Sequence, residues 1–186
     1  MRFRLVLALL IGMTSAGVVV SGAQSKPAAS APPVIVLDTE KGMIEFETFP
    51  QDAPKSVAHL LALVRRGFYR GLRFHWVQPG VIQIGDPLTR NMTKTADWGN
   101  GDSGERVGVA EISKRPFVRG SVGLFYKQGR KPEDSDSQFF ILLADNPALN
   151  GKYIAIGRVT KGLDVAGKIQ RADMLKLAYV KGEPPK

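Results

Sequence analysis

The chain contains no cysteine and only 2 histidines among its 186 residues. Without cysteine there are no disulfides, no thiol nucleophile and no thiolate metal ligands. His59 and His75 have no carboxylate at metal-ligand spacing, so we predict no metal site. A Gly-Xaa-Ser-Xaa-Gly nucleophile elbow and a phosphate-binding loop are also missing. Conventional catalytic signatures are therefore absent, and we expect no cofactor.

Acidic residues are outnumbered, because 26 Lys and Arg accompany 17 Asp and Glu and give a net charge of +9. A basic surface can indicate nucleic-acid binding. Here the basic residues are scattered and aromatic residues are not interleaved with them, so we predict no nucleic-acid partner. Weak attraction to acidic envelope surfaces is the alternative interpretation of the charge.

Residues 1–23 have the pattern of a cleaved secretory signal. Arg2 and Arg4 precede an apolar run from Leu5 to Ile11, and Ser21-Gly22-Ala23 supplies small residues for signal peptidase. An uncleaved membrane anchor is the alternative, but polar and small residues interrupt the apolar stretch. We therefore expect a periplasmic or secreted protein with no integral membrane span after cleavage.

The remainder is expected to be a flexible linker at residues 24–33, rich in Ser, Ala, Pro and Lys, and one domain at residues 34–180. The domain opens with a predicted β-hairpin. Val34–Asp38 is a β-branched apolar run, and Ile44–Glu47 alternates between apolar and charged residues.

A helix is predicted next, with Asp52 as its N-cap and Pro54 in its first turn. Its apolar stripe consists of Val57, Leu60, Leu61 and Val64. These positions recur at helical spacing, and Gly67 is a suitable C-terminal stop.

Short strands dominate the rest of the domain. We predict two strands within residues 72–85 around a Pro79-Gly80 turn, and a polar surface loop at residues 86–106. Three further strands are expected at Ser121–Phe125, Gln138–Leu143 and Tyr153–Val159, before a short helix at Gly162–Ile169. Many short strands, two helices and no βαβ alternation favour a mainly β fold, an antiparallel barrel capped by helices.

Five groups of residues, in order along the chain, resemble the cyclophilin family of peptidyl-prolyl cis-trans isomerases. They are Gly42–Glu47 with Asp52–Val57, Gly67–His75, Gln83–Asp86, Ser137–Ile141, and Leu149–Tyr153 with Gly157–Val159. The resemblance covers residues 34 to about 171 and implies a closed antiparallel eight-stranded cyclophilin-like barrel capped by two helices. It also implies a monomeric isomerase that assists the folding of exported proteins, with proline-containing segments of client proteins as its partners.

Isomerisation of an Xaa–Pro bond is slow because amide resonance sets a barrier of roughly 18–20 kcal/mol. No covalent bond to the enzyme is needed. In the twisted state the proline nitrogen becomes pyramidal and gains a lone pair. A donor aimed at that nitrogen therefore binds the twisted form better than the planar form and lowers the barrier.

The resemblance assigns roles to particular residues. Its catalytic positions are Trp76, Gln83 and Gln138, of which the two glutamines would hydrogen-bond the substrate backbone. Its substrate-binding positions are His75, Val81, Phe125, Phe140, Leu149 and Tyr153. Among these, Phe140 and Leu149 would line the proline pocket. Phe139, one residue away on the strand, should point into the barrel.

The chain departs from the family pattern at this same site. Trp76 stands where the family has arginine, so one neutral donor replaces five charged ones. Val81 is the nearest counterpart of an aromatic pocket wall, and Phe125 replaces a small residue. Lys127 or Arg130 is a candidate replacement for the arginine. We expect an isomerase of low activity; the alternative is a catalytically weak or inactive peptide-binding or chaperone module.

Overall fold

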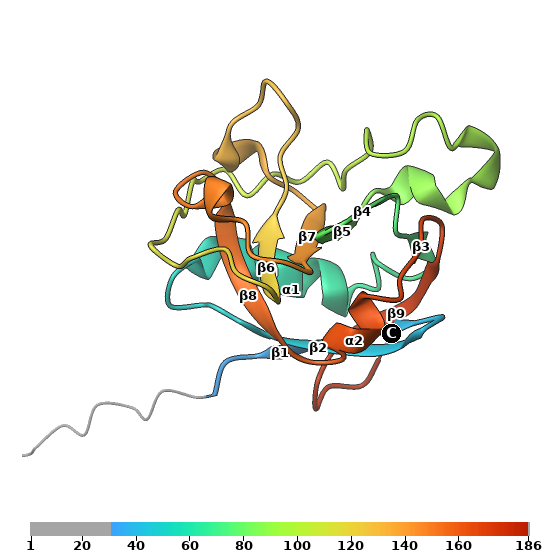
Figure 1. Ribbon diagram of the computed structural model, residues 1–186, viewed down its shortest axis with the longest axis horizontal. Coiled ribbons are helices and arrows are strands. Elements are labelled where there is room, and N and C mark those ends of the chain that lie inside the picture. The colour runs from blue at the N-terminus through green and yellow to red at the C-terminus, as the bar shows by residue number, and fades with distance from the viewer. Residues whose placement is uncertain (1–30, 186) are drawn as a thin grey trace, which may run out of the picture. The chain divides into compact units, whose positions relative to one another are not determined.

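The structure is a computed structural model that describes residues 31–185. They form one antiparallel sheet of nine strands with two helices (Figure 1). The predicted signal at 1–23 and the linker up to residue 30 lie outside the described residues. Within the described part, no helix has the length and hydrophobicity needed to cross a bilayer.

The sheet follows the short-strand pattern of the sequence. Its strands are β1 (Val34–Thr39), β2 (Gly42–Thr48), β3 (Leu72–Arg73), β4 (Trp76–Gln78), β5 (Val81–Ile84), β6 (Ser121–Leu124), β7 (Phe139–Leu142), β8 (Ile154–Lys161) and β9 (Met174–Val180). Helix α1 (Pro54–Arg65) packs against β8 and β9, and α2 (Leu163–Ala166) packs against β2. Single 3-10 turns lie at η1 (Pro87–Arg90), η2 (Met92–Lys94), η3 (Pro132–Asp134) and η4 (Pro147–Leu149).

The mainly β, cyclophilin-like fold is confirmed, but the closed eight-stranded barrel is wrong in detail. The strand order is β3-β9-β1-β2-β8-β6-β7-β5-β4, so the sheet curls into a half-barrel whose edge strands β3 and β4 do not pair with each other. The chain between these edges bends at Phe74-His75. Phe74 N–H donates to Asp173 O at 3.0 Å, whereas His75 N–H donates to Gln83 O at 3.3 Å. The strand expected before the Pro79-Gly80 turn is thereby divided into β3, which pairs with β9, and β4, which pairs with β5.

Strand β9 has no counterpart among the predicted strands, because a bulge disturbs its alternation. Leu177 pairs with Asp38 and Leu175 with Thr39, which leaves Lys176 as the extra residue. A bulge of this kind interrupts the period of two on which sequence recognition of a strand depends. β9 nevertheless pairs with β1 and β3 and so occupies an interior position in the sheet.

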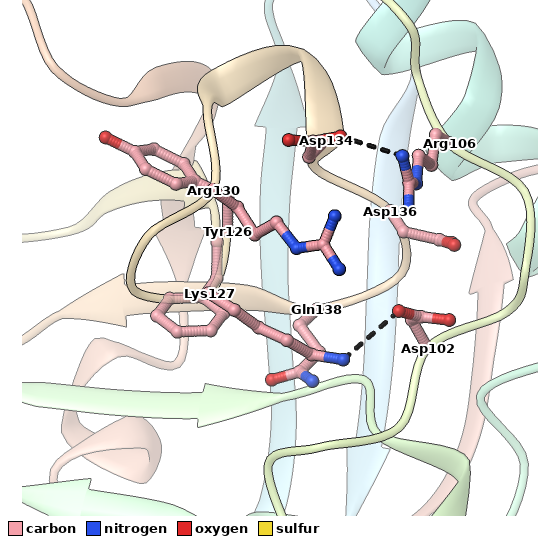
Figure 2. Close-up of a pocket in the computed structure, with 9 residues that line it drawn as sticks. Asp102, Arg106, Tyr126, Lys127, Arg130, Asp134, Asp136 and Gln138 are labelled. Atoms are coloured by element: carbon pink, nitrogen blue, oxygen red, sulfur yellow. Dashed lines mark hydrogen bonds and ion pairs between the residues drawn. The ribbon is translucent and has the colours of Figure 1, made fainter.

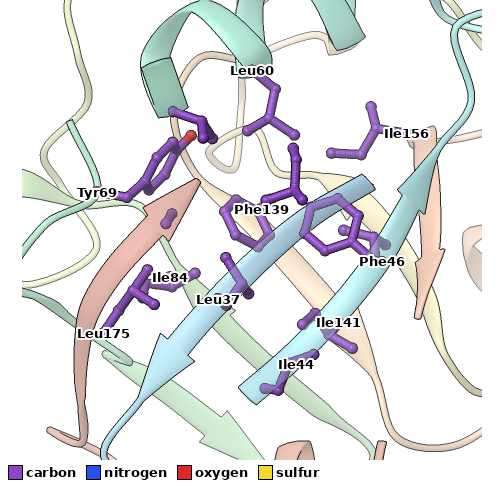
Figure 3. Packing of buried hydrophobic residues seen from close by; sticks show 14 of the residues in the cluster. Leu37, Ile44, Phe46, Leu60, Tyr69, Ile84, Phe139, Ile141, Ile156 and Leu175 are labelled. Atoms are coloured by element: carbon purple, nitrogen blue, oxygen red, sulfur yellow. The ribbon is translucent and has the colours of Figure 1, made fainter. Parts of the chain in front are cut away.

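The main core fills the concave side of the sheet beneath α1. Figure 3 shows Leu60 of α1 facing the rings of Phe46 and Phe139, whose centroids lie 6.0 Å apart. Phe139 is 1% exposed, so its predicted inward orientation is confirmed. Burial of each such side chain contributes about 1.5–3 kcal/mol.

The N-terminus of α1 is capped from a distance. Ala53 occupies the N-cap position and makes no side-chain cap, so the predicted Asp52 cap is wrong. Asp52 instead pairs with Arg115 at 2.7 Å. The carboxylate of Glu111 accepts hydrogen bonds from the N–H groups of Lys55 at 3.0 Å and Ser56 at 2.8 Å. A cap from a distant part of the chain has no local sequence signature.

Replacing Glu111 by Ala should lower the free energy of unfolding by about 1–2 kcal/mol, because two helix N–H groups lose their acceptor. Urea unfolding measures the change. Glu105→Ala is the matched control: it removes an exposed ion pair with Arg66 and should cost about 0.5 kcal/mol or less. Equal effects of the two variants would contradict the capping role of Glu111.

Candidate active site

A small apolar pocket lies on the convex side of the sheet, at β5, β7 and η4. It has a volume of about 170 Å³ and is lined by Trp76, Val81, Gln83, Phe125, Phe140, Leu142, Asn146, Leu149 and Tyr153. A second cluster of buried residues, separate from the main core, lies beneath it and consists of Phe117, Phe140, Leu142 and Ala155. Phe140 and Leu142 of this cluster line the pocket. The pocket volume is several times the ~30 Å³ of a water molecule in the liquid, so it accommodates a small side chain.

Strand register brings the pocket residues together. Trp76 on β4 pairs with Gln83 on β5, and Gln83 pairs with Phe140 on β7. Phe140 in turn pairs with Gly123 on β6. Residues directly opposite each other point to the same face, so the four positions form one row across the sheet. A Cβ at Gly123 would collide with the Phe140 ring, and only glycine allows the ring to lie over β6.

Aromatic contacts hold the floor and one wall of the pocket. The Phe140 ring lies 5.8 Å from Phe117 and meets Tyr153 edge-on at 5.4 Å. Tyr153 also stacks on Tyr126 at 4.7 Å. Burial, followed by the neighbouring Tyr126, raises the pKa of the Tyr153 hydroxyl. The hydroxyl therefore stays protonated at neutral pH and can donate a hydrogen bond.

The side chains of the two predicted glutamines are hydrogen-bonded to each other. Gln138 Nε2 donates to Gly99 O at 3.0 Å and to Gly101 O at 2.6 Å, and its Oε1 accepts from Gln83 Nε2 at 2.8 Å. Gln138 is buried behind the pocket and is absent from its lining. Gln138 therefore orients Gln83 Nε2, and of the two glutamines it is Gln83 that lines the pocket.

Both candidate replacements for the missing arginine line a different cavity. It is polar, has a volume of about 50 Å³, and includes Lys127, Arg130 and Gln138 in its lining. Figure 2 shows ion pairs within it, including Lys127 with Asp102 at 3.3 Å. Phe125 borders both this cavity and the apolar pocket. Neither Lys127 nor Arg130 lines the apolar pocket.

A groove of about 730 Å³ adjoins the pocket. The residues common to both are Trp76, Gln83, Phe125 and Tyr153. His75 lines this groove and not the pocket. Trp98 and Arg171 also line it, and neither belongs to the predicted site. Arg171 lies 96 positions after His75, whose carbonyl it binds, and matches no motif, so no local signal indicates it.

The predicted surface loop at 86–106 forms part of the groove wall because buried polar groups hold it in place. Asp86 is fully buried and its carboxylate accepts a hydrogen bond from Gly99 N–H. The Gln138 amide binds the carbonyls of Gly99 and Gly101. A Cβ at Gly101 would collide with the Asp86 carboxylate. The loop is therefore fixed at the end that meets the site.

Comparison with known proteins assigns the chain to a family. A model of the family "Cyclophilin type peptidyl-prolyl cis-trans isomerase/CLD" matches residues 34–184. A "Probable peptidyl-prolyl cis-trans isomerase" of Brucella abortus is 39% identical over 166 residues, which cover 87% of this chain and 84% of that protein. The chain belongs to the cyclophilin family.

Further cyclophilins support this membership and the fold. "Peptidyl-prolyl cis-trans isomerase B" of Bacillus subtilis is 34% identical, with 75% of this chain and 91% of that protein covered. A crystal structure of a cyclophilin type peptidyl-prolyl cis-trans isomerase from Cryptosporidium parvum has a TM-score of 0.70 and 25% identity. The match covers 82% of this chain and 99% of that chain.

In this cyclophilin Trp76 remains 53% exposed beside the pocket. Arg73, three residues earlier, donates from Nη1 to Ala172 O at 2.8 Å and lines neither the pocket nor the groove. The structure thus brings seven predicted site residues to the pocket: Trp76, Val81, Gln83, Phe125, Phe140, Leu149 and Tyr153. Gln138 lies behind them, and His75 lies in the groove wall at 6% exposure.

Burial is the largest influence on His75 and lowers its pKa. The folded protein therefore binds the His75 proton less readily than the unfolded chain, whose histidines titrate near pH ~6.5. Above about pH 6.5 the residue is neutral in both states. As the pH falls through that value, the unfolded chain takes up a proton that the folded protein does not, so stability falls.

We expect the free energy of unfolding to decrease between about pH 7.5 and about pH 5.5. The decrease should be smaller in His75→Gln, which cannot titrate. Urea unfolding at several pH values measures both slopes. His59→Gln is the control. It should retain the part of the pH dependence of the free energy of unfolding that His75 causes. An unchanged slope in His75→Gln would show that the buried imidazole does not titrate in this range.

Proposed function

We propose that this cyclophilin catalyses cis-trans isomerisation of Xaa–Pro bonds in peptide segments of client proteins. The observation that carries the proposal is the row of Trp76, Gln83 and Phe140, which places two polar side chains beside a proline-sized apolar pocket. The names of the relatives agree with this activity.

In the proposed mechanism, the protein lowers the barrier mainly by binding the proline ring and orienting the substrate backbone. The proline ring packs on Phe140 against Leu149 and Val81, which holds one side of the amide. Gln83 hydrogen-bonds the substrate backbone, with its orientation set by Gln138 at 2.8 Å. Rotation of the rest of the amide then needs no covalent intermediate. These contacts reduce the freedom of the substrate before the barrier is crossed.

In this mechanism Trp76 stabilises the twisted amide by donating a hydrogen bond. Its indole N–H is a single neutral donor, whereas an arginine would offer a charged fork. Loss of one well-aimed donor costs on the order of 10²–10³ in rate. The proposed enzyme is therefore slow compared with a cyclophilin that carries the arginine.

A second candidate function is peptide binding with negligible catalysis. The observation that favours it is the 53% exposure of Trp76 at the pocket rim. Exposed tryptophan beside an apolar pocket is an effective binding anchor. Such a protein would hold proline-containing segments of unfolded clients as a chaperone does.

Isomerisation of a blocked Ala–Pro peptide, measured by exchange NMR, separates these candidates. The natural protein should be active, and Trp76→Arg should raise kcat/KM by up to ~10²–10³. Leu149→Ala should lower kcat/KM roughly tenfold, because it removes part of the pocket wall. Leu88→Ala, at an exposed leucine outside the pocket and the groove, should leave kcat/KM unchanged.

Two results would change the conclusion. If the natural protein binds the peptide without isomerising it, and Trp76→Arg is active, the binding function replaces the catalytic one. If the natural protein neither binds nor isomerises the peptide, the proposal fails. Thermal unfolding of each variant verifies that the fold is retained.

We also propose that the clients are exported proteins, met in the periplasm or outside the cell. Support comes from the signal-like pattern of residues 1–23. N-terminal sequencing of the protein recovered from the envelope or medium should find a start at or near Gln24. Leu9→Glu, which breaks the apolar run, should keep the chain in the cytoplasm. Retention of Met1 in the exported protein would contradict cleavage.

A further inference from the structure

Arg171 is held firmly at the edge of the groove. Its Nε donates to His75 O at 3.2 Å and its Nη2 donates to Thr95 O at 3.2 Å. The guanidinium also lies over the ring of Trp98, 5.1 Å from the centroid. These contacts fix the side chain from three directions, and they leave Nη1 without an acceptor among the described residues.

The backbone next to Arg171 is equally constrained. Ala172 has a φ of 75°, a left-handed conformation that non-glycine residues rarely adopt. Its N–H donates to Phe74 O at 2.8 Å, and its carbonyl accepts from Arg73 at 2.8 Å. Strained residues held by their surroundings are typical of functional sites. Here the strained turn directs Arg171 toward the groove.

The charge of Arg171 is not neutralised. None of the residues that line the groove is Asp or Glu, and no ion pair within residues 31–185 involves Arg171. His75, the other titratable basic residue of the lining, is kept neutral by burial, which lowers its pKa. Arg171 is thus the one cationic side chain among the lining residues that the structure describes.

Several aromatic side chains line the same groove as this charge, and one of them, Trp98, lies directly against the guanidinium. They include Trp76, Trp98, Tyr126 and Tyr153. Low-dielectric walls focus the field of a charge into the cleft that they border. A carboxylate that enters the groove would therefore meet an oriented cation with a free donor, at a smaller entropic cost than a flexible lysine would impose.

We infer that Arg171 forms a subsite for a carboxylate of the bound peptide, close to the proline. The groove and the proline pocket share Trp76, Gln83 and Phe125, so a peptide that fills the pocket extends into the groove. This inference rests on the proposed function, because it assumes that the peptide is anchored by proline. The carboxylate comes from a Glu or Asp side chain near the proline or from a peptide C-terminus.

The test uses blocked hexapeptides with a central Ala–Pro, in which Glu or its neutral isostere Gln is placed in turn at each flanking position. Affinity is measured by NMR titration. At one position the Glu peptide should bind roughly fivefold more tightly than the Gln peptide, as for a partly exposed charge pair. Raising the salt concentration should reduce this preference. A Gln peptide with a free C-terminus tests the other source of the carboxylate.

Variants of Arg171 decide the assignment. Arg171→Gln should abolish the preference for Glu, whereas Arg171→Lys, which keeps the charge, should retain part of it. Arg158→Gln is the matched control, because it removes the same charge from an exposed site on β8 outside the groove. It should leave the preference unchanged. Thermal unfolding of all three variants verifies the fold.

Failure of this inference is distinct from failure of the proposed function. If Glu and Gln peptides bind equally while Leu149→Ala weakens both, proline recognition stands and the carboxylate subsite is wrong. If Arg158→Gln also loses the preference for Glu over Gln peptides, that preference is an effect of net charge, and the subsite is wrong. If the natural protein binds none of the proline peptides, both conclusions fall.

Discussion

Alternation along β7 links the fold of this cyclophilin to its site. Successive side chains of a strand point to opposite faces, so Phe139 enters the main core while Phe140 forms the floor of the pocket. The register of β7 with β5 then sets Gln83 beside Phe140, and β5 with β4 sets Trp76 beside Gln83. A slip of one residue would exchange core and pocket faces. The stability of the sheet therefore fixes the geometry of the site.

Buried polar side chains attach the loop at residues 86–106 to the sheet. Gln138, next to Phe139, orients Gln83 on one side and binds the carbonyls of Gly99 and Gly101 on the other. Asp86, just after β5, binds the N–H of Gly99 from below. Unpaired buried amide and carboxylate groups are costly, so these bonds hold the loop to the sheet. The groove wall is consequently a continuation of the strand scaffold.

At the position where the family pattern has arginine, this chain has a neutral side chain, Trp76. The pocket itself has no cationic lining residue within the described part of the chain, and positive charge is found in its neighbours, at Arg171 in the groove and at Lys127 in the polar cavity. Lys127 is paired with Asp102, whereas Arg171 has no acidic partner among residues 31–185. Positive charge near the pocket therefore lies outside its lining.

The sequence by itself determined the family, the mainly β class and the group of seven residues at the pocket, because motif spacing and strand alternation are local properties. It did not determine the cap of α1 by Glu111, the bulged strand β9, the split at Phe74-His75, or the approach of Arg171 to His75. Each of these depends on contacts between segments far apart in the chain or on a break in local periodicity. Only the tertiary structure decides them, because long-range hydrogen bonds have no pattern within a short sequence window.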